Sequence, residues 1–378
     1  MPDDEPIPVT GAWRPGDHPG RRQFVTVFDD RPLALRAGAT LSSVTVAYET
    51  WGTLSPARDN AVLICHALTG DSHAAGPVEP GHPQLGWWNA LIGPGRAIDT
   101  DRFFVVCPNV LGGCQGTTGP SSVDPATGTP YGPRFPVITI RDQVDVEAAL
   151  ADELGIDAWV SVIGGSAGGQ RVLEWTIKYA DRVPRAVVIA CGAAATAEQI
   201  ALCALQIRAI EADPHFRGGD YYNLIEGPWR GMSIARGIGQ VSYRSELELQ
   251  QRFNRGHQND EHPFEGGHYT VESYLEYHGD KLARRFDANT YIVLSHAMNH
   301  HDVGRGRGGV AEALARVTAE VTIAGISTDR LYSLRLQHEL ADLIPRNKGV
   351  AVVHSIAGHD GFLTEHEAIG DIIADSLV

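Results

Sequence analysis

The sequence predicts an α/β protein with a mostly parallel sheet, helices on both faces of that sheet, and a helical insertion. Short apolar runs rich in Val, Ile and Ala alternate with amphipathic stretches, which is typical of a parallel sheet covered on both sides. A polar, helix-like stretch interrupts this alternation, and strand-like runs return after it. The chain has 378 residues, 43% hydrophobic and 20% charged, as expected for a globular protein with a large core.

The first part of the sheet domain is expected to span residues 1–195. Its apolar runs are short and end in turn-forming residues, as buried parallel strands do. Between them, apolar residues recur at helical spacing, and Gly155 and Pro184 mark the ends of two helices. The pattern predicts strands at 42–50, within 61–70 and 103–122, and at 158–165 and 185–193, with helices at 141–155 and 170–184.

The middle of the chain, residues 196–290, has the pattern of helical pieces joined by polar loops. We expect this block to be a helical lid inserted into the sheet domain, although a second packing layer would give the same pattern. Strand-like runs return at 290–298, at 319–327 and within 349–360. The second part of the core is therefore expected to span residues 291–378.

Composition excludes several classes of protein. The formal net charge of −15 argues against a nucleic-acid partner, because contacts to phosphates need clustered Lys and Arg. No apolar run is long enough to span a bilayer, and the acidic, Pro-rich start lacks the pattern of a signal peptide. The five cysteines show no C-x-x-C spacing, so we expect no disulfide framework, no metal site and a reducing, cytoplasmic location.

The clearest chemical signal surrounds Ser166, which lies in the segment 164–168 between a predicted strand and a predicted helix. A G-x-S-x-G pattern in this context predicts a sharp turn that presents the serine as a nucleophile. A serine hydroxyl needs a base, and that base needs an orienting acid. Asp329 and His359 follow later predicted strands in the required order, so we expect a triad of Ser166, His359 and Asp329.

The turn "HALTG" (66–70) ends an early predicted strand, where this architecture places a donor to the oxyanion of the reaction. The backbone N–H groups of Leu68 and Ala167 are therefore the expected oxyanion hole. They would stabilise the negative charge that develops when the serine attacks a carbonyl group.

A second glycine-rich stretch offers a competing interpretation. The segment "GRGRGG" (304–309) matches the dinucleotide-binding pattern G-x-G-x-x-G, with Asp329 downstream as a ribose-binding acid. That fingerprint requires the glycines directly at the end of a strand. Residues 299–303 separate these glycines from the nearest strand-like run, so the nucleophile interpretation is favoured.

Eight motifs carry a resemblance that runs from about residue 35 to the C-terminus. They are "HALTGDSHAAGP", "GWWNALIGPG", "NVLGGCQGTTGPSS", "RFPVITIRDQV", "GGSAGG…LEW", "SYLEYHGDKLARRFDANTYI", "ISTDRLYSLRLQHELA" and "AGHDGFL". Together they resemble the homoserine O-acetyltransferase family. The resemblance implies an α/β-hydrolase fold, a homodimer, and ping-pong transfer of acetyl from acetyl-CoA to the hydroxyl of L-homoserine in methionine biosynthesis. Acetyl-CoA would be a co-substrate, with no permanently bound cofactor.

The resemblance also implies roles for individual residues. The triad residues match the family's nucleophile, acid and base. Asp360 matches the residue that holds the substrate ammonium, and Arg236 matches the residue that holds its carboxylate. Tyr243 is expected near the same pocket. The family usually has Met where this chain has Ala167, a change that keeps the backbone N–H but could enlarge the pocket, and Pro where it has Ser333.

The acyl donor and the acceptor have alternatives. Relatives that use succinyl-CoA tend to carry Arg two positions after the triad acid, where this chain has Leu331, so we expect acetyl-CoA. The neighbouring Arg330 is expected to point away from the pocket. Relatives that acetylate L-serine or a deacetylated antibiotic share the same framework, and a plain esterase remains a further alternative.

Overall fold

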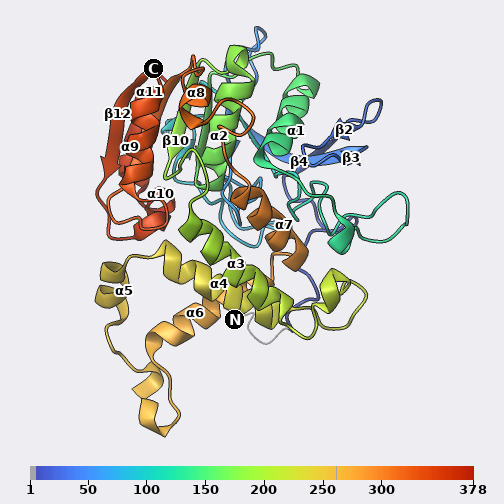
Figure 1. Ribbon diagram of the computed structural model, residues 1–378, viewed down its shortest axis with the longest axis vertical. Helices are drawn as coiled ribbons and strands as arrows, with labels where there is room; N and C mark the ends of the chain where they lie inside the picture. Colours follow the sequence, from blue (N-terminus) through green and yellow to red (C-terminus); the bar gives the residue numbers. More distant parts are fainter. Residues whose placement is uncertain (1–5, 261) are drawn as a thin grey trace.

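An eight-stranded sheet forms the centre of the computed structural model, which describes residues 6–260 and 262–378 (Figure 1). Two short strand pairs lie outside this sheet, β2 (Leu33–Ala34) with β3 (Thr40–Leu41) and β6 (Ile92–Gly93) with β7 (Ile98–Asp99). In spatial order the strands of the large sheet are β1 (Gln23–Val27), β4 (Val44–Trp51), β8 (Phe104–Pro108), β5 (Ala61–Cys65), β9 (Ser161–Gly165), β10 (Arg185–Ile189), β11 (Glu320–Ile326) and β12 (Asn347–Val353).

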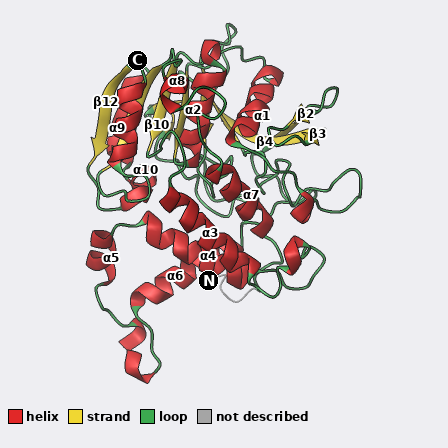
Figure 2. Cartoon of the chain, in the orientation of Figure 1, coloured by secondary structure: helices red, strands yellow, loops and turns green. Residues whose placement is uncertain are grey.

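The sheet is mostly parallel. In spatial order, the six strands β8, β5, β9, β10, β11 and β12 each pair in parallel with the next. Strand β4 is antiparallel to both of its neighbours, β1 and β8. Figure 2 shows the strands gathered at one end of the molecule, while the other end is helical. The helices are α1 (Ile140–Glu153), α2 (Ala167–Lys178), α3 (Ala197–Glu211), α4 (Trp229–Tyr243), α5 (Glu246–Phe253), α6 (Thr270–Ala283), α7 (Ala288–Asn299), α8 (Val310–Leu314), α9 (Leu334–Leu343), α10 (Gly361–Thr364) and α11 (His366–Ser376).

The side chains of strand β5 show that both faces of the sheet are covered. All five of its residues are buried, and successive side chains of a strand point to opposite faces. Leu63 packs into the hydrophobic cluster that contains residues of α1, α2 and α9. Val62 and Ile64 pack into the second cluster, which contains residues of α11. The predicted α/β class with helices on both faces is therefore confirmed.

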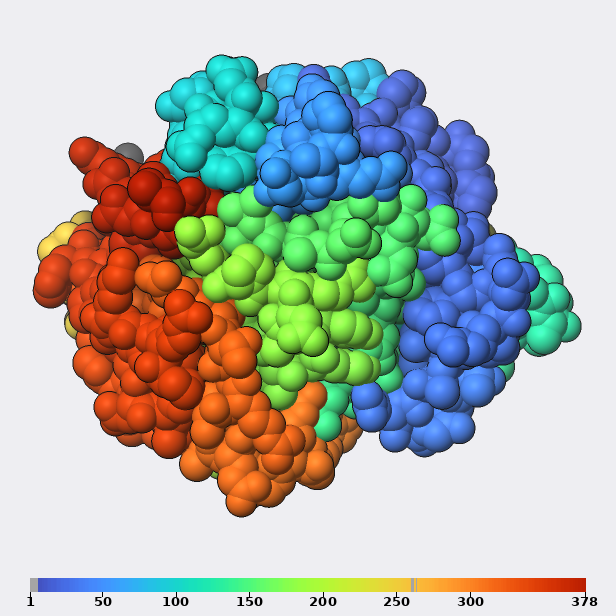
Figure 3. Space-filling model, turned by 90° about the horizontal axis from the view of Figure 1, so that it is seen from above, coloured from blue at the N-terminus to red at the C-terminus, as the bar shows by residue number. Residues whose placement is uncertain are grey.

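Helices α3 to α6 form a separate block beside the carboxyl ends of the strands (Figure 1). Helix α4 packs against both α3 and α6, and a third hydrophobic cluster joins this block to α7 through residues such as Met232 and Leu294. Seen from the opposite end (Figure 3), the blue, green and orange-red parts of the sheet domain fill the view, and yellow residues of the block appear only at the margin.

One predicted element is wrong. Residues 290–298 were expected to form a strand, but they belong to helix α7. The Asp287 side chain accepts a hydrogen bond from the Thr290 N–H at 2.9 Å and so caps the helix. Buried Tyr291 and Leu294 lie at helical spacing, a signal that the β-branched residues between them obscured. The expected boundary at residue 290 consequently falls inside a helix, and the helical region continues to Asn299.

This correction also removes the context for a dinucleotide fingerprint. The segment 304–309 follows helix α7 instead of a strand, and it leads into α8, a helix of only five residues. Among the described residues, no helix combines the length and the apolar character needed to cross a membrane. The five cysteines are all unpaired and buried.

Candidate active site

Ser166 occupies a strained turn between β9 and α2. Its backbone angles are φ 57° and ψ −126°, a region that residues other than glycine rarely adopt. A Cβ atom on Gly168 would lie 2.0 Å from the carbonyl oxygen of Cys65, and one on Gly164 would lie 2.7 Å from the backbone of Gly168. The glycines are therefore required by close backbone packing, and the turn is the predicted nucleophile elbow.

Ser166 and His359 meet at hydrogen-bonding distance, although 193 positions separate them in the chain. His359 Nε2 lies 2.8 Å from Ser166 Oγ, and His359 Nδ1 lies 2.7 Å from Asp329 Oδ2. Asp329 follows β11, and His359 lies in the 3-10 turn Gly358–Asp360 after β12. The three side chains therefore form a continuous chain from a buried carboxylate to the serine hydroxyl.

The surroundings favour a basic histidine held in one orientation. Burial acts to lower the pKa of His359, but the Asp329 carboxylate outweighs it and raises that pKa above its ordinary value. Asp329 is fixed in turn, because its Oδ1 accepts the backbone N–H groups of Leu331 and Tyr332, both at 2.8 Å. This arrangement suits a base that takes a proton from Ser166 and returns it later.

Both expected oxyanion donors lie near the serine, because Leu68 lines the same cavity as Ser166 and Ala167 follows Ser166 in the chain. Ala167 is the first residue of α2, and Leu68 lies in the loop that follows β5. Within the described part of the chain, neither of these backbone N–H groups donates a hydrogen bond to another protein group. Both groups are therefore available to an added oxygen, as an oxyanion hole requires.

A cavity of about 80 Å³ opens above Ser166 and His359. Helices α3 and α4 of the helical block, together with α7, supply part of its wall, so these helices cover Ser166. The guanidinium carbon of Arg236 lies 5.3 Å from the centre of the Tyr243 ring. The lining includes all the side chains that were assigned to the acceptor and the acyl donor, namely Arg236, Tyr243, Leu331 and Asp360.

Arg244 is a charged neighbour of this cavity that the sequence did not indicate. Its Nη2 atom lies 3.1 Å from Asp360 Oδ2, and its Nη1 atom lies 3.0 Å from Glu248 Oε1. Tyr332 was also missed, and its ring stacks on His359 with a centroid distance of 5.2 Å. Neither contact follows from a sequence motif, because each depends on how the helical block and the strand ends pack together.

Arg330 lies outside the cavity, as expected, and the space beside Ala167 is small. Arg330 donates to the backbone carbonyl of Val241 in α4 and does not line the cavity. Beside Ala167 the structure has a cavity of only about 10 Å³, with Met298 in its wall. That is about the room for one water molecule, so the alanine does not enlarge the pocket to a useful extent.

A larger cavity of about 460 Å³ adjoins the catalytic one. The two share the lining residues Ala67, Thr69, Arg236 and Leu363. Three more arginines line the larger cavity, together with two aspartates, and these are Arg22, Arg284, Arg285, Asp17 and Asp71. Its volume falls within the range of about 300–1,000 Å³ that is usual for ligand sites.

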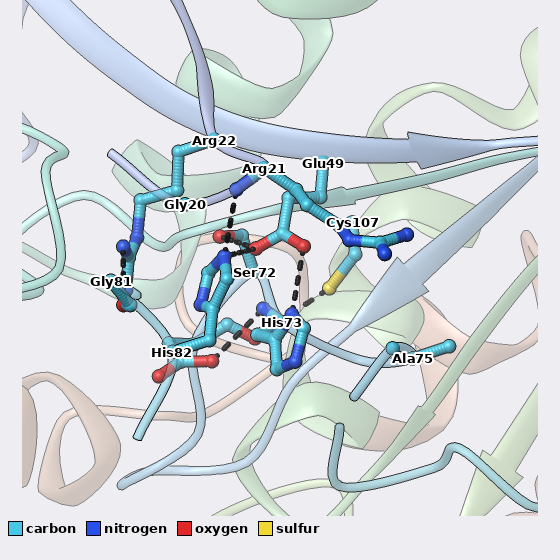
Figure 4. A network of polar contacts seen from close by, with 12 residues as sticks. Gly20, Arg21, Arg22, Glu49, Ser72, His73, Ala75, Gly81, His82 and Cys107 are labelled. Carbon is cyan, nitrogen blue, oxygen red and sulfur yellow. Dashed lines mark hydrogen bonds and ion pairs between the residues drawn. The ribbon is translucent and has the colours of Figure 1, made fainter. Parts of the chain in front are cut away.

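One group of side chains among the described residues has the composition of a metal site. Glu49, His73 and His82 are buried, and their ligand atoms lie within 4.8 Å of one another (Figure 4). However, Glu49 already accepts a hydrogen bond from Ser72 at 2.9 Å and faces His73 Nδ1 at 2.9 Å, while His82 Nε2 accepts the Arg21 N–H at 2.9 Å. A hydrogen-bonded network that joins β4 to the following loops explains the cluster without a metal.

The pKa values in this cluster agree with such a network. Burial acts to lower the pKa of His73, but the Glu49 carboxylate outweighs it and raises the pKa above its ordinary value. Burial lowers the pKa of His82 to about 4. The rings of His73 and His82 stack at 3.8 Å, and both face the Glu49 carboxylate, at 2.9 Å and 3.5 Å, as members of one hydrogen-bonded network.

The chain is similar to known proteins over nearly its whole length. Residues 60–365 match the model of the family described as alpha/beta hydrolase fold. The chain is 56% identical over 373 residues to a homoserine O-acetyltransferase from Thermobifida fusca (strain YX), which covers 98% of each protein. A crystal structure of homoserine O-acetyltransferase from Bacillus anthracis superposes with a TM-score of 0.86 and 28% identity, covering 94% of this chain and 97% of that one. The crystal structure of esterase E22 has a TM-score of 0.85 and 28% identity, covering 94% and 99%.

Proposed function

The chain belongs to the homoserine O-acetyltransferase family on the alpha/beta hydrolase fold, and on that premise we propose that it transfers acetyl from acetyl-CoA to the side-chain hydroxyl of L-homoserine. It is an enzyme of the acyltransferase class. The observation that carries the proposal is that the Ser166–His359 pair opens into a cavity lined by one cation, Arg236, and one anion, Asp360. A small zwitterion with a reactive hydroxyl needs both charges.

The proposed reaction is a double displacement. His359 Nε2 accepts the proton of Ser166 while Oγ attacks the thioester carbonyl of acetyl-CoA, and the N–H groups of Leu68 and Ala167 stabilise the oxyanion. The carbon–sulfur bond then breaks, and His359 returns its proton to the leaving CoA thiolate. Next, the homoserine hydroxyl gives its proton to His359 and attacks the acetyl ester. The ester bond to Ser166 breaks, and His359 protonates the released serine oxygen.

The two adjoining cavities suggest a division between acceptor and donor. The smaller one, of about 80 Å³, is lined by Ser166, Arg236 and Asp360, so we assign the acetyl group and the acceptor to it. The larger one, of about 460 Å³, suits the arm of CoA, since ligand sites of this size hold larger molecules. We propose that Arg284 in its wall attracts the phosphate groups of CoA, because guanidinium groups bind phosphate through paired hydrogen bonds.

We propose a homodimer in a reducing, cytoplasmic compartment. Five unpaired cysteines fit such a compartment. The outer faces of α3 and α4, which pack against each other, carry the exposed apolar side chains Leu205, Ile234 and Val241. An apolar surface of this kind favours contact with a second copy. Sedimentation of the purified protein should give the mass of a dimer, and a monomer at micromolar concentration would contradict this proposal.

Hydrolysis of acetyl esters is the second candidate function, and the likeness to esterase E22 favours it. The two functions differ in what attacks the acetyl-enzyme: an amino-acid hydroxyl or water. The charged pair Arg236 and Asp360 in the cavity wall favours the amino acid, because a hydrolase has no need to bind a zwitterion.

Release of free CoA thiol from acetyl-CoA tests the proposal and its alternatives together. The enzyme is incubated with acetyl-CoA alone, with L-homoserine, with L-serine, or with L-methionine, which has no hydroxyl. We expect fast thiol release only with homoserine, and O-acetylhomoserine as the product. If thiol release without any acceptor were as fast as with homoserine, the enzyme would be a hydrolase. Faster release with L-serine than with L-homoserine would identify L-serine as the acceptor.

A further inference from the structure

Two arginines donate hydrogen bonds to the carbonyl groups that flank Leu68, the proposed oxyanion donor. Arg171 Nη2 donates to the carbonyl oxygen of His66 at 2.7 Å. Arg285 Nη2 donates to the carbonyl oxygen of Thr69 at 2.8 Å. The segment between these two carbonyls is closed by a turn in which the Gly70 N–H bonds to the Ala67 oxygen at 2.9 Å. The loop that carries the Leu68 N–H is therefore held from both ends.

Arg171 connects this loop to the helix of the nucleophile. It lies in α2, one turn after Ala167, and its side chain is only 2% exposed. Its Nε lies 2.8 Å from Oε1 of Glu147 in α1, and Glu147 is equally buried. The second oxygen of Glu147 accepts the indole N–H of Trp175 at 2.8 Å. A buried ion pair fixed on two helices leaves the guanidinium little freedom, so its bond to His66 sets the distance between the loop and α2.

The His66 side chain adds a contact on the other side of the loop. Its Nε2 atom accepts the backbone N–H of Val110 at 3.0 Å, beyond the end of β8. Burial, together with the charge of Arg171, lowers the pKa of His66 to about 3. A neutral ring can keep accepting this hydrogen bond throughout the neutral range, because the accepting nitrogen carries no proton.

Arg285 connects the same loop to the helical block. It follows α6, and its own carbonyl oxygen accepts a hydrogen bond from Gln115 Nε2 at 2.8 Å. The charge of Arg285 also acts on Asp71 at the end of the loop. Burial works to raise the pKa of Asp71, but the charges of Arg285 and Arg22 hold it below its ordinary value. The positive charge of Arg285 therefore favours an ionised Asp71 at the end of the loop.

We propose that Arg171 and Arg285 are positioning residues that fix the Leu68 N–H relative to the Ala167 N–H, and so hold the oxyanion hole ready for catalysis. Neither arginine needs to touch the reacting atoms. The inference rests on the proposed acyl transfer through Ser166. An oxyanion forms both when Ser166 is acetylated and when the acceptor removes the acetyl group, so displacing one donor should slow both half-reactions by a similar factor.

The test compares Arg171→Lys and Arg171→Met with the wild type in both half-reactions. Acylation is followed as the burst of p-nitrophenol from p-nitrophenyl acetate, which does not need the CoA cavity. Deacylation is followed as the loss of the acetyl group after addition of L-homoserine. Removal of one oxyanion donor slows enzymes by about a hundredfold to a thousandfold. For a displaced donor we expect about tenfold to a hundredfold in each half-reaction, with KM little changed.

The Arg171→Lys variant protects the test against a failure to fold. Its ammonium group would keep a charge for Glu147, but a single ammonium does not reproduce the fork that also reaches the His66 carbonyl. Arg307→Met is the matched control, because Arg307 pairs with Glu174 of the same helix, Nη2 to Oε2 at 2.8 Å, and makes no contact with the loop. Arg285→Met should show the same slowing of both half-reactions with the small ester.

The outcomes separate the positioning role from the proposed function. Wild-type rates in a folded Arg171→Lys enzyme, or a loss confined to one half-reaction, would overturn the positioning role. If Arg307→Met slowed both half-reactions as much as the Arg171 variants, general destabilisation would explain the loss, and the positioning role would again be overturned. A wild-type enzyme that shows the burst but ignores acetyl-CoA would disprove the proposed function, while the comparison of bursts would still decide the role of Arg171. A wild type without any burst would contradict both.

Discussion

Arg244 and Asp360 form an ion pair of 3.1 Å between Nη2 and Oδ2, which joins the end of α4 to the residue that follows His359. The pair places a residue of the helical block in contact with the proposed ammonium site. Among the described residues, the other oxygen of Asp360 has no side-chain partner. Arg244 therefore orients the carboxylate and leaves one oxygen for the ammonium group that we propose it binds.

Asp360→Asn should weaken the reaction with the acceptor without affecting the donor. Loss of a buried charge partner costs about 2–5 kcal/mol, so kcat/KM for homoserine should fall at least about thirtyfold. Acetylation of Ser166 by acetyl-CoA should stay near the wild-type rate.

Arg244→Met should also lower kcat/KM for homoserine, but by a smaller factor than Asp360→Asn. Arg252→Met is the control. Arg252, like Arg244, lies near Glu248, with Nη1 3.9 Å from Oε1, but Asp360 pairs with Arg244. Equal losses in Arg244→Met and Arg252→Met would contradict the orienting role.

Arg236→Ala should have the same selectivity for the acceptor half-reaction. The guanidinium lies in the cavity wall over the Tyr243 ring, where it can pair with the substrate carboxylate. We expect a fall in kcat/KM for homoserine of a size similar to that for Asp360→Asn. Arg230→Ala on the same helix is the control, because its side chain is 58% exposed and pairs with Glu226. If acetylation of Ser166 fell as much as acceptor turnover, Arg236 would belong to the donor site.

The donor preference depends on Leu331. Its position in the cavity wall offers no cation to the distal carboxylate of succinyl-CoA, and an unpaired buried charge is costly. We expect kcat/KM for acetyl-CoA to exceed that for succinyl-CoA, and Leu331→Arg to shift the ratio toward succinyl-CoA. Arg330→Leu should leave the ratio unchanged, because Arg330 contacts the backbone of α4 outside the cavity. A wild type that prefers succinyl-CoA would refute this assignment.

The rate should follow the protonation of His359. Below its pKa the ring carries a proton and does not accept the one from Ser166, so kcat/KM for acetyl-CoA should fall about tenfold per pH unit toward acid. Asp329 raises this pKa, so the midpoint should lie above the ordinary value of about 6.5. Asp329→Asn should lower the midpoint and reduce kcat by about 10⁴. A wild-type midpoint below the ordinary value would contradict the contact at 2.7 Å.

The sequence alone was sufficient to predict the candidate triad residues and most strands of the sheet. The glycines at 164 and 168 predicted the elbow. They are needed there because a Cβ atom at either position would collide with the neighbouring backbone. Asp329 and His359 could be placed because parallel strands bring their carboxyl ends to the same edge. The motif resemblance added Arg236 and Asp360, and both lie in the cavity wall.

Contacts between distant segments could not be predicted in this way. Arg171 and Glu147 lie on separate helices, and nothing in their local sequence marks them as a buried ion pair. The pairing of Arg244 with Asp360 depends on where the helical block rests on the sheet domain. Residues 290–298 were misassigned because a helix buried on most sides has an apolar run that resembles a strand.

The central claim is that Ser166 carries the acetyl group between donor and acceptor, and intact-protein mass spectrometry tests it most directly. After mixing with acetyl-CoA alone, the wild type should gain one acetyl group, which should disappear when L-homoserine is added. Ser242→Ala, which removes another serine of the cavity wall, should gain the same acetyl group. Ser166→Ala should gain none. A Ser166→Ala enzyme that still becomes acetylated and turns over at a near-normal rate would contradict the account.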